Sequence, residues 1–169
     1  ALNADASSLY FSCTARLFIM SVAPIGAAFV FAGNGNTGST NGPVTIATFD
    51  APKGLTVLPS GVVYVVDSGN NHIRGITNGV TSVFAGSRTG APGNLDAVGT
   101  SARFASPNAI TYVAAQPAFY VSDSGPYQIR RISPNSATVT TFAGSTSTGL
   151  VNGVGTSARF YSPQQMAVH

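Results

Sequence analysis

One stretch of this sequence occurs twice in nearly identical form. Residues 64–76 read YVVDSGNNHIRGI, and residues 120–132 read YVSDSGPYQIRRI, 56 positions later. A repeat of a few tens of residues is typical of folds in which one small unit is stacked several times. The period therefore limits this chain to a repeated architecture.

Shorter motifs recur at similar intervals. FAG occurs at 31–33, 84–86 and 142–144, and GTSARF occurs at 99–104 and 155–160. A proline precedes a similar apolar run three times, at Pro52, Pro107 and Pro163. One period then contains four strand-like runs, a number that predicts the blade of a β-propeller.

Composition supports an all-β fold. Short runs of Val, Ile, Thr, Phe and Tyr are separated by turns rich in the 19 Gly and 10 Pro of this 169-residue chain. No segment keeps apolar residues at the i, i+3, i+4, i+7 spacing of a helix. We therefore expect one all-β domain of four-stranded antiparallel units.

The segments SPNAI, FYVSDSGPYQIRRI and VTTFAG together resemble the NHL repeat, whose blades build six-bladed β-propellers. The resemblance covers residues 49–169 well and residues 1–30 poorly. SLYFSC, RLFIMS and AAFVFAG are similar to the second, third and fourth strands of a degenerate blade that lacks the Asp-Ser-Gly turn.

The resemblance divides the chain into parts of a single propeller segment, residues 1–169. We expect a degenerate partial blade at 1–33, full blades at 49–86 and 104–144, and the inner strand of a further blade at 162–169. The chain ends form a split blade, which gives about three blade equivalents. Three blades cannot close a propeller, so the open strand edges need partners. Two copies joined head to tail give six blades.

The repeated Asp-Ser-Gly turn predicts a structural role for Asp67 and Asp123. An Asp side chain can accept hydrogen bonds from backbone N–H groups of a tight turn. Gly69 and Gly125 are expected to supply a positive φ there. A residue that recurs in every unit is better explained by structure than by catalysis.

Four arginines also recur and are expected to be structural. Arg103 and Arg159 of GTSARF precede the proline-led strands, where they can donate to loop carbonyls and pack their stems on the adjacent Phe. Arg74 and Arg130 occupy the same place in IRGI and IRRI.

The long loops and the turns after the Asp residues share one face in a propeller of this kind. That face is a candidate recognition surface for a protein or glycan ligand. Its predicted binding residues are Asn70, Asn71, His72, Arg88, Tyr127 and Gln128.

Relatives that the resemblance suggests include lyases, but the sequence offers little for catalysis. Its two histidines, His72 and His169, occupy different repeat positions, and no metal-ligand cluster, G-x-S-x-G elbow or phosphate loop is present. We therefore expect no catalytic residue, metal or cofactor, which favours a non-enzymatic protein. A net charge of +3 is too small to predict nucleic-acid binding.

The surface has few charges. Only 8% of residues are charged, Glu is absent, and Lys53 is the sole lysine. Weak charge repulsion favours association.

Cys13 has no partner for an internal disulfide. The apolar run 17–32 is shorter than a membrane span, contains Pro24, and is expected to form buried strands.

Two functions from different classes remain. The first is a structural, self-assembling subunit, secreted or surface-exposed, which joins copies of itself or adjacent repeat units by strand completion into a ring or fibril. The second is a ligand-binding or lyase-type propeller, of which this chain is a fragment or half.

Overall fold

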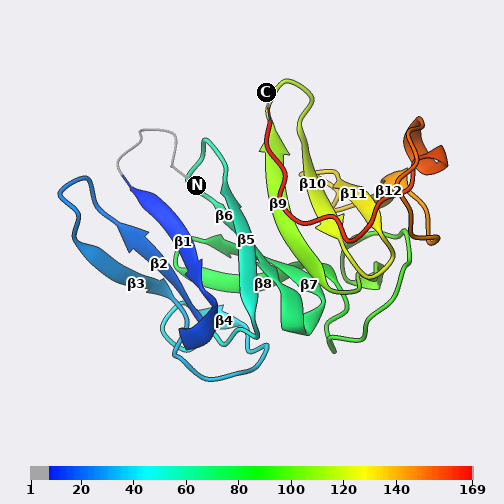
Figure 1. Cartoon of the computed structure of the whole chain (residues 1–169). Helices are drawn as coiled ribbons and strands as arrows, with labels where there is room; N and C mark the ends of the chain where they lie inside the picture. The colour runs from blue at the N-terminus through cyan, green and yellow to red at the C-terminus, as the bar shows by residue number, and fades with distance from the viewer. Residues whose placement is uncertain (1–7, 169) are drawn as a thin grey trace.

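The structure is a computed structural model that describes residues 8–168 (Figure 1). These residues form three antiparallel sheets, and their helical content is four short 3-10 turns. The turns are η1 (Thr14–Arg16), η2 (Ser68–Asn70), η3 (Gly99–Ser101) and η4 (Gly155–Ser157). The all-β prediction is confirmed.

The sheets follow the chain in order. The first contains β1 (Leu9–Cys13), β2 (Phe18–Val22) and β3 (Ala28–Ala32). The second contains β5 (Pro52–Val57), β6 (Val63–Asp67), β7 (His72–Thr77) and β8 (Val80–Gly86), with the short β4 (Gly42–Pro43) paired to β8. The third contains β9 (Pro107–Val113), β10 (Ala118–Asp123), β11 (Gln128–Ile132) and β12 (Val139–Gly144).

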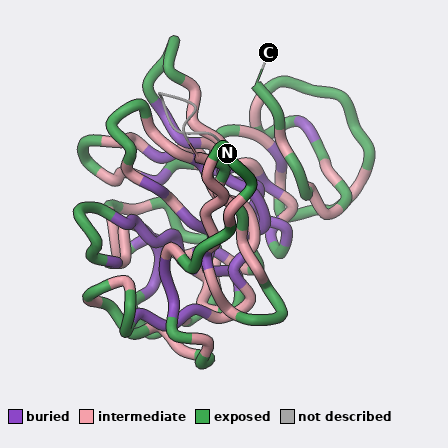
Figure 2. Tube along the Cα trace, turned by 90° about the vertical axis from the view of Figure 1, so that its left-hand side faces the viewer, coloured by how far each residue is buried: buried purple, intermediate pink, exposed green. Residues whose placement is uncertain are grey.

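The second sheet is covered on both faces. Val65 belongs to an apolar cluster with Ile19 of the first sheet, whereas its neighbour Val66 packs with Phe119 and Val121 of the third. Successive residues of a strand point to opposite faces, so β6 contributes to two cores at once. Figure 2 shows the buried stretches in the interior and the exposed residues concentrated in turns and loops.

The inner strands of adjacent sheets approach closely. A Cβ on Gly54 of β5 would lie 2.6 Å from Cα of Ala109 on β9, so only glycine fits at this contact. Residues 162–168 run along β9 in turn (Figure 1), where Ser122 and Ser124 donate to the carbonyls of Gln164 and Pro163, both at 2.6 Å.

A similar turn precedes β5, β9 and residues 162–168. Ala51, Ser106 and Ser162, each directly before a proline, have φ values of +45°, +53° and +51°. Residues 162–168 pair with no described strand, and His169 lies outside the described residues. That this segment is the inner strand of a further blade therefore stays a prediction.

The apolar run 17–32 forms β2 and β3, but most of it is not buried. Only Ile19 and Ala32 lie in the core, while Phe29 and Val30 are exposed. The expectation of buried strands was wrong here. Val30 lies on the face that no other described sheet covers, and Phe29, on the face toward the second sheet, remains exposed as well. Within residues 8–168, no helix is long and apolar enough to cross a membrane.

Candidate binding surfaces

The repeated Asp67 is the centre of a buried polar cluster. Its Oδ1 accepts from the backbone N–H of Asp50 at 2.7 Å. Its Oδ2 accepts from Asn70 Nδ2 at 2.9 Å and Arg74 Nη1 at 3.0 Å, and lies 3.1 Å from His72 Nε2. The side chains of Asp67, His72 and Arg74 are fully buried. The carboxylate therefore joins the second sheet to the loop that precedes it.

This arrangement corrects the predicted capping role. Asp67 accepts from the side chain of Asn70 but from no backbone N–H of the turn that follows it. Its backbone donor lies 17 residues upstream, and that of Asp123 is Ala105 N–H, 18 residues upstream. The capping geometry fails because the carboxylate turns inward toward its arginine. The structural assignment of Asp67 and Asp123 is consistent with these contacts.

The predicted role of Gly69 and Gly125 also needs correction. The positive φ falls two residues later, on Asn71 at +52° and Tyr127 at +58°. The glycines are required by close approach instead, because a Cβ on Gly125 would lie 2.7 Å from the carbonyl oxygen of Ala105.

The third sheet repeats the pairing of a buried Asp with a buried Arg, but Pro126 and Gln128 stand where the second sheet has Asn70 and His72. Arg130 Nη1 donates to Asp123 at 3.1 Å and to the Arg103 carbonyl at 3.0 Å. Its Nη2 donates to Asp96, where the equivalent Arg74 donates to Asn41. Arg130 is thus shared between two carboxylates. Burial raises the pKa of Asp123 to about 7, although hydrogen bonds from Ala105 N–H and Arg130 act against that rise.

The two GTSARF arginines behave differently. Arg103 Nη1 donates to the carbonyls of Thr100, Ser101 and Ala102, as expected for a loop-binding arginine. Arg159 is exposed. The ring of Phe104 lies 5.4 Å from the guanidinium carbon of Arg130, so this Phe supports the buried arginine.

The six predicted binding residues do not form one surface. His72 and Gln128 are buried at the starts of β7 and β11, and His72 Nδ1 contacts the Ser87 carbonyl at 3.0 Å. Their prediction as exposed ligands was wrong, because both side chains point into the sheet. Arg88 is exposed, whereas the remaining three, Asn70, Asn71 and Tyr127, are half-buried.

Sequence reasoning missed an aromatic pair that occurs in every sheet. Tyr10–Phe31, Tyr64–Phe84 and Tyr120–Phe142 have ring centroids 4.9, 4.8 and 4.9 Å apart, all edge to face. The signal was present, because the three tyrosines share one repeat position and the three phenylalanines begin FAG.

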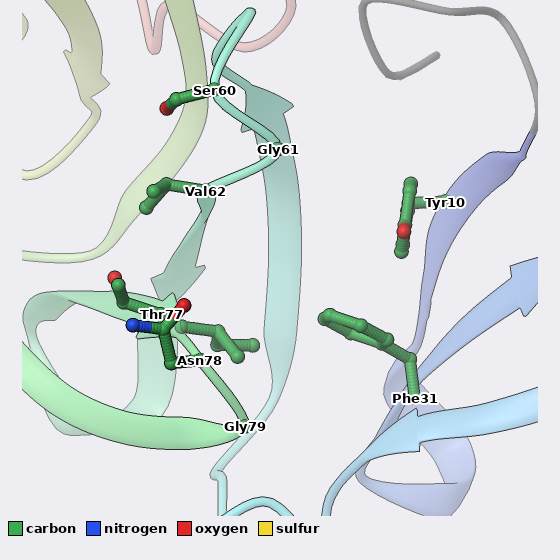
Figure 3. Close-up of a pocket in the computed structure, with 9 residues that line it drawn as sticks. Tyr10, Phe31, Ser60, Gly61, Val62, Thr77, Asn78 and Gly79 are labelled. Atoms are coloured by element: carbon green, nitrogen blue, oxygen red, sulfur yellow. The ribbon is translucent and has the colours of Figure 1, made fainter.

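The environments of these pairs differ. Phe119 of the third sheet packs on the second pair, with its centroid 4.4 Å from Tyr64 and 5.7 Å from Phe84. A cavity of about 220 Å³ adjoins the first pair. Figure 3 shows Tyr10 and Phe31 on one side of it and the turns at 60–62 and 77–79 on the other. Nothing described packs a further sheet on the third pair, and Phe142 is 51% exposed.

The first sheet, at the other end of the molecule from the third sheet, also has an apolar face that no described sheet covers. Phe11, Met20 and Val30 are directly opposite one another across β1, β2 and β3, so they share one face of the first sheet. Leu9 lies on the same face as Phe11, and Tyr10 points to the other side, toward the second sheet.

A second cavity, about 400 Å³ in volume, lies beside the inner strands and is polar. Lys53, Asn108 and Gln164 line it with the hydroxyl-bearing Ser12 and Thr14. Within residues 8–168, no group of three or more His, Cys, Asp or Glu side chains could hold a metal ion.

The sequence profile of the NHL repeat matches residues 49–76. Residues 49–76 are therefore similar to an NHL repeat. The chain is 30% identical over 130 residues to NHL repeat-containing protein 2 of Bos taurus, an alignment that covers 70% of this chain and 18% of the relative.

Solved structures share the fold of this chain. An auxiliary nutrient binding protein from Bacteroides ovatus superposes with a TM-score of 0.70 at 22% identity, over 95% of this chain and 40% of that one. Virginiamycin B lyase from Staphylococcus aureus superposes with a TM-score of 0.57 at 20% identity, over 84% and 39%. At such identities the likeness establishes the propeller-type fold alone. The chain spans less than half the length of each of these three relatives.

Proposed function

We propose that this chain is a non-enzymatic NHL propeller subunit that assembles head to tail. The open face of the third sheet docks on the open face of the first sheet of a second copy. The observation that carries this proposal is the Tyr120–Phe142 pair, which is the exposed equivalent of a pair that Phe119 covers within the chain.

The first sheet carries a matching residue. Leu9, Val63 and Phe119 each lie four positions before the last residue of β1, β6 and β10. Val63 and Phe119 face the preceding sheet. Leu9 therefore faces away from the other two described sheets and is 47% exposed. A second copy can therefore place its Leu9 on Tyr120 and Phe142.

The contact is heterologous, since two different faces meet. Two copies can close into a ring, or many copies can extend into a filament, depending on the rotation at the contact. Other exposed apolar side chains near the third sheet, Leu150, Val151, Val154 and Tyr161, add area to this docking face.

The lyase alternative has less support from the site. His72 is fully buried, and both of its ring nitrogens contact oxygen atoms of the chain, Asp67 Oδ2 and the Ser87 carbonyl. It is therefore not placed to act on a bound substrate.

Sedimentation of the 169-residue chain over a range of concentrations tests the proposal. We expect dimers or larger assemblies for the wild type, and monomers for Phe142→Ser and Leu9→Arg. Ile25→Ser is the control, because Ile25 is 90% exposed and lies in the turn between β2 and β3, not on a strand. A wild type that stays monomeric, or a folded Phe142→Ser variant that assembles normally, would overturn the docking model.

A further inference from the structure

Three equivalent positions line the polar cavity beside the inner strands. Lys53, Asn108 and Gln164 each directly follow the proline that begins an inner segment. The repeat therefore brings one polar side chain from each of three successive units to the same hollow. Because these positions belong to inner segments, the cavity is separate from the two docking faces proposed above.

Among residues 8–168, Lys53 is the only cation that lines this cavity. Its Nζ donates to Oδ1 of Asn108 at 2.6 Å. Asn108 is held in that orientation because its own Nδ2 donates to Ser124 Oγ and to the Ser106 carbonyl. An ammonium group has three N–H donors, so two remain after the bond to Asn108.

The charge of Lys53 is not balanced nearby. Within residues 8–168, no carboxylate lies within ion-pair distance of its Nζ, and the ion pairs there involve Asp67, Asp96 and Asp123 with other partners. Lys53 is half-buried, so solvent screens it less than a fully exposed lysine. A half-buried cation that faces a polar hollow attracts an anion.

We propose that this cavity binds a small hydrophilic molecule that carries an oxyanion, with Lys53 holding the anionic oxygens. The carboxamides of Gln164 and Gln165 and the hydroxyl of Ser12 offer both donors and acceptors to hydroxyl groups of the ligand. The volume of about 400 Å³ lies in the range of small-molecule sites. A single lysine serves one anionic group, which distinguishes this site from a nucleic-acid groove.

Calorimetric titration of the full chain in a chloride buffer tests this site with three probes of similar size. Glucuronate carries a carboxylate, glucose 1-phosphate carries a phosphate, and glucose is the neutral control. We expect at least one of the two anions to bind about tenfold or more tightly than glucose, a difference that one charge-assisted contact can supply. The anion that binds more tightly shows whether the site prefers a carboxylate or a phosphate.

Variants locate the site. Lys53→Met and Gln164→Glu should each weaken anion binding about tenfold or more, the second because its carboxylate pairs with Lys53 in place of the ligand. Arg88→Gln is the charge-matched control, since Arg88 is an exposed cation outside the cavity. The proposal is wrong if neither anion binds at millimolar concentration, if glucose binds equally well, or if both variants keep wild-type affinity. Gln164 is exposed, so Gln164→Glu keeps the test valid should Lys53→Met fail to fold.

Discussion

Arg130 donates through Nη1 to Oδ2 of Asp123 at 3.1 Å, and both side chains are fully buried. The same pair occurs at Arg74 and Asp67, 56 residues earlier, at 3.0 Å. In the first sheet the equivalent positions hold Cys13 and Met20. The ion pair therefore belongs to the two complete sheets, where it joins Arg on the third strand to Asp at the end of the second. The same Asp accepts from a backbone N–H of the loop before the first strand.

Removing one partner of this pair should be costly. At a pH above the Asp123 pKa of about 7, we expect Arg130→Met to lower the free energy of unfolding by about 3–5 kcal/mol, because it leaves the ionised Asp123 buried without its countercharge. Urea denaturation monitored by circular dichroism measures the loss.

The double variant Asp123→Leu/Arg130→Met is the control for that measurement. Removing both charges should recover part of the lost stability, since no uncompensated charge remains buried. A double variant that is less stable than Arg130→Met would contradict this account.

Stability should fall as the pH rises from about 4 to about 7 through the contribution of Asp123. Burial raises the pKa of this carboxyl to about 7 in the folded chain, whereas an unfolded Asp titrates near ~3.9. Between these values the folded state binds more protons than the unfolded state, so each step up in pH lowers the free energy of unfolding. Denaturant midpoints across this range should show the slope, and Asp123→Asn should flatten it.

The contribution of Asp96 to stability should change with pH in the direction opposite to that of Asp123. Burial alone would raise its pKa, but hydrogen bonds from Thr141 and Arg130 together lower it. Its contribution is present above the unfolded pKa of about 3.9 and is lost as the pH falls through the folded value. Asp96→Asn should therefore change the pH dependence only in acid. If Asp123→Asn keeps the wild-type slope between about pH 4 and 7, the assignment to Asp123 is wrong.

Gly125 should not tolerate a side chain. An added Cβ would lie 2.7 Å from the Ala105 carbonyl oxygen and 2.8 Å from the Ala105 Cβ, so Gly125→Ala is expected to cost about 1–3 kcal/mol through overpacking. Gly149→Ala is the matched control, because its nearest neighbour is the Arg159 side chain at an ordinary 3.4 Å. Thermal unfolding of the two variants should separate them; equal melting temperatures would argue against the close contact.

Much of the fold could be predicted from the repeat. The strand sequence around YVxDSG and IRxI recurs with its turns, so local pattern and period agree, and β6, β7, β10 and β11 follow from it. The role of the Asp residues could not be derived in this way. Their donors, Asp50 and Ala105, come from the preceding loop, whose position depends on tertiary packing.

The candidate sites were harder to predict for a similar reason. His72 follows the polar turn SGNN and was expected at the surface, but it is the first residue of β7 and pairs with Asp67. The Lys53 cavity requires three inner segments more than 50 residues apart in sequence to meet. The aromatic pairs, in contrast, were recoverable, because Tyr64 and Tyr120 already stood in the aligned repeat.

The junction between the second and third sheets should depend on Phe119. Its ring is fully buried and lies 4.4 Å from Tyr64, 5.7 Å from Phe84 and 5.3 Å from Tyr112, measured between centroids. Phe119→Ala removes these contacts and leaves a cavity, so we expect the free energy of unfolding to fall by about 3–5 kcal/mol. Phe29→Ala is the control, because Phe29 is 59% exposed and a surface change of this kind stays within about 0.5 kcal/mol. Urea denaturation of both variants measures the difference. If Phe119→Ala is no more destabilising than Phe29→Ala, the contact of Phe119 with the Tyr64–Phe84 pair does not hold adjacent sheets together. The proposed docking of a second copy on Tyr120 and Phe142, which is based on that contact, would then lose its support.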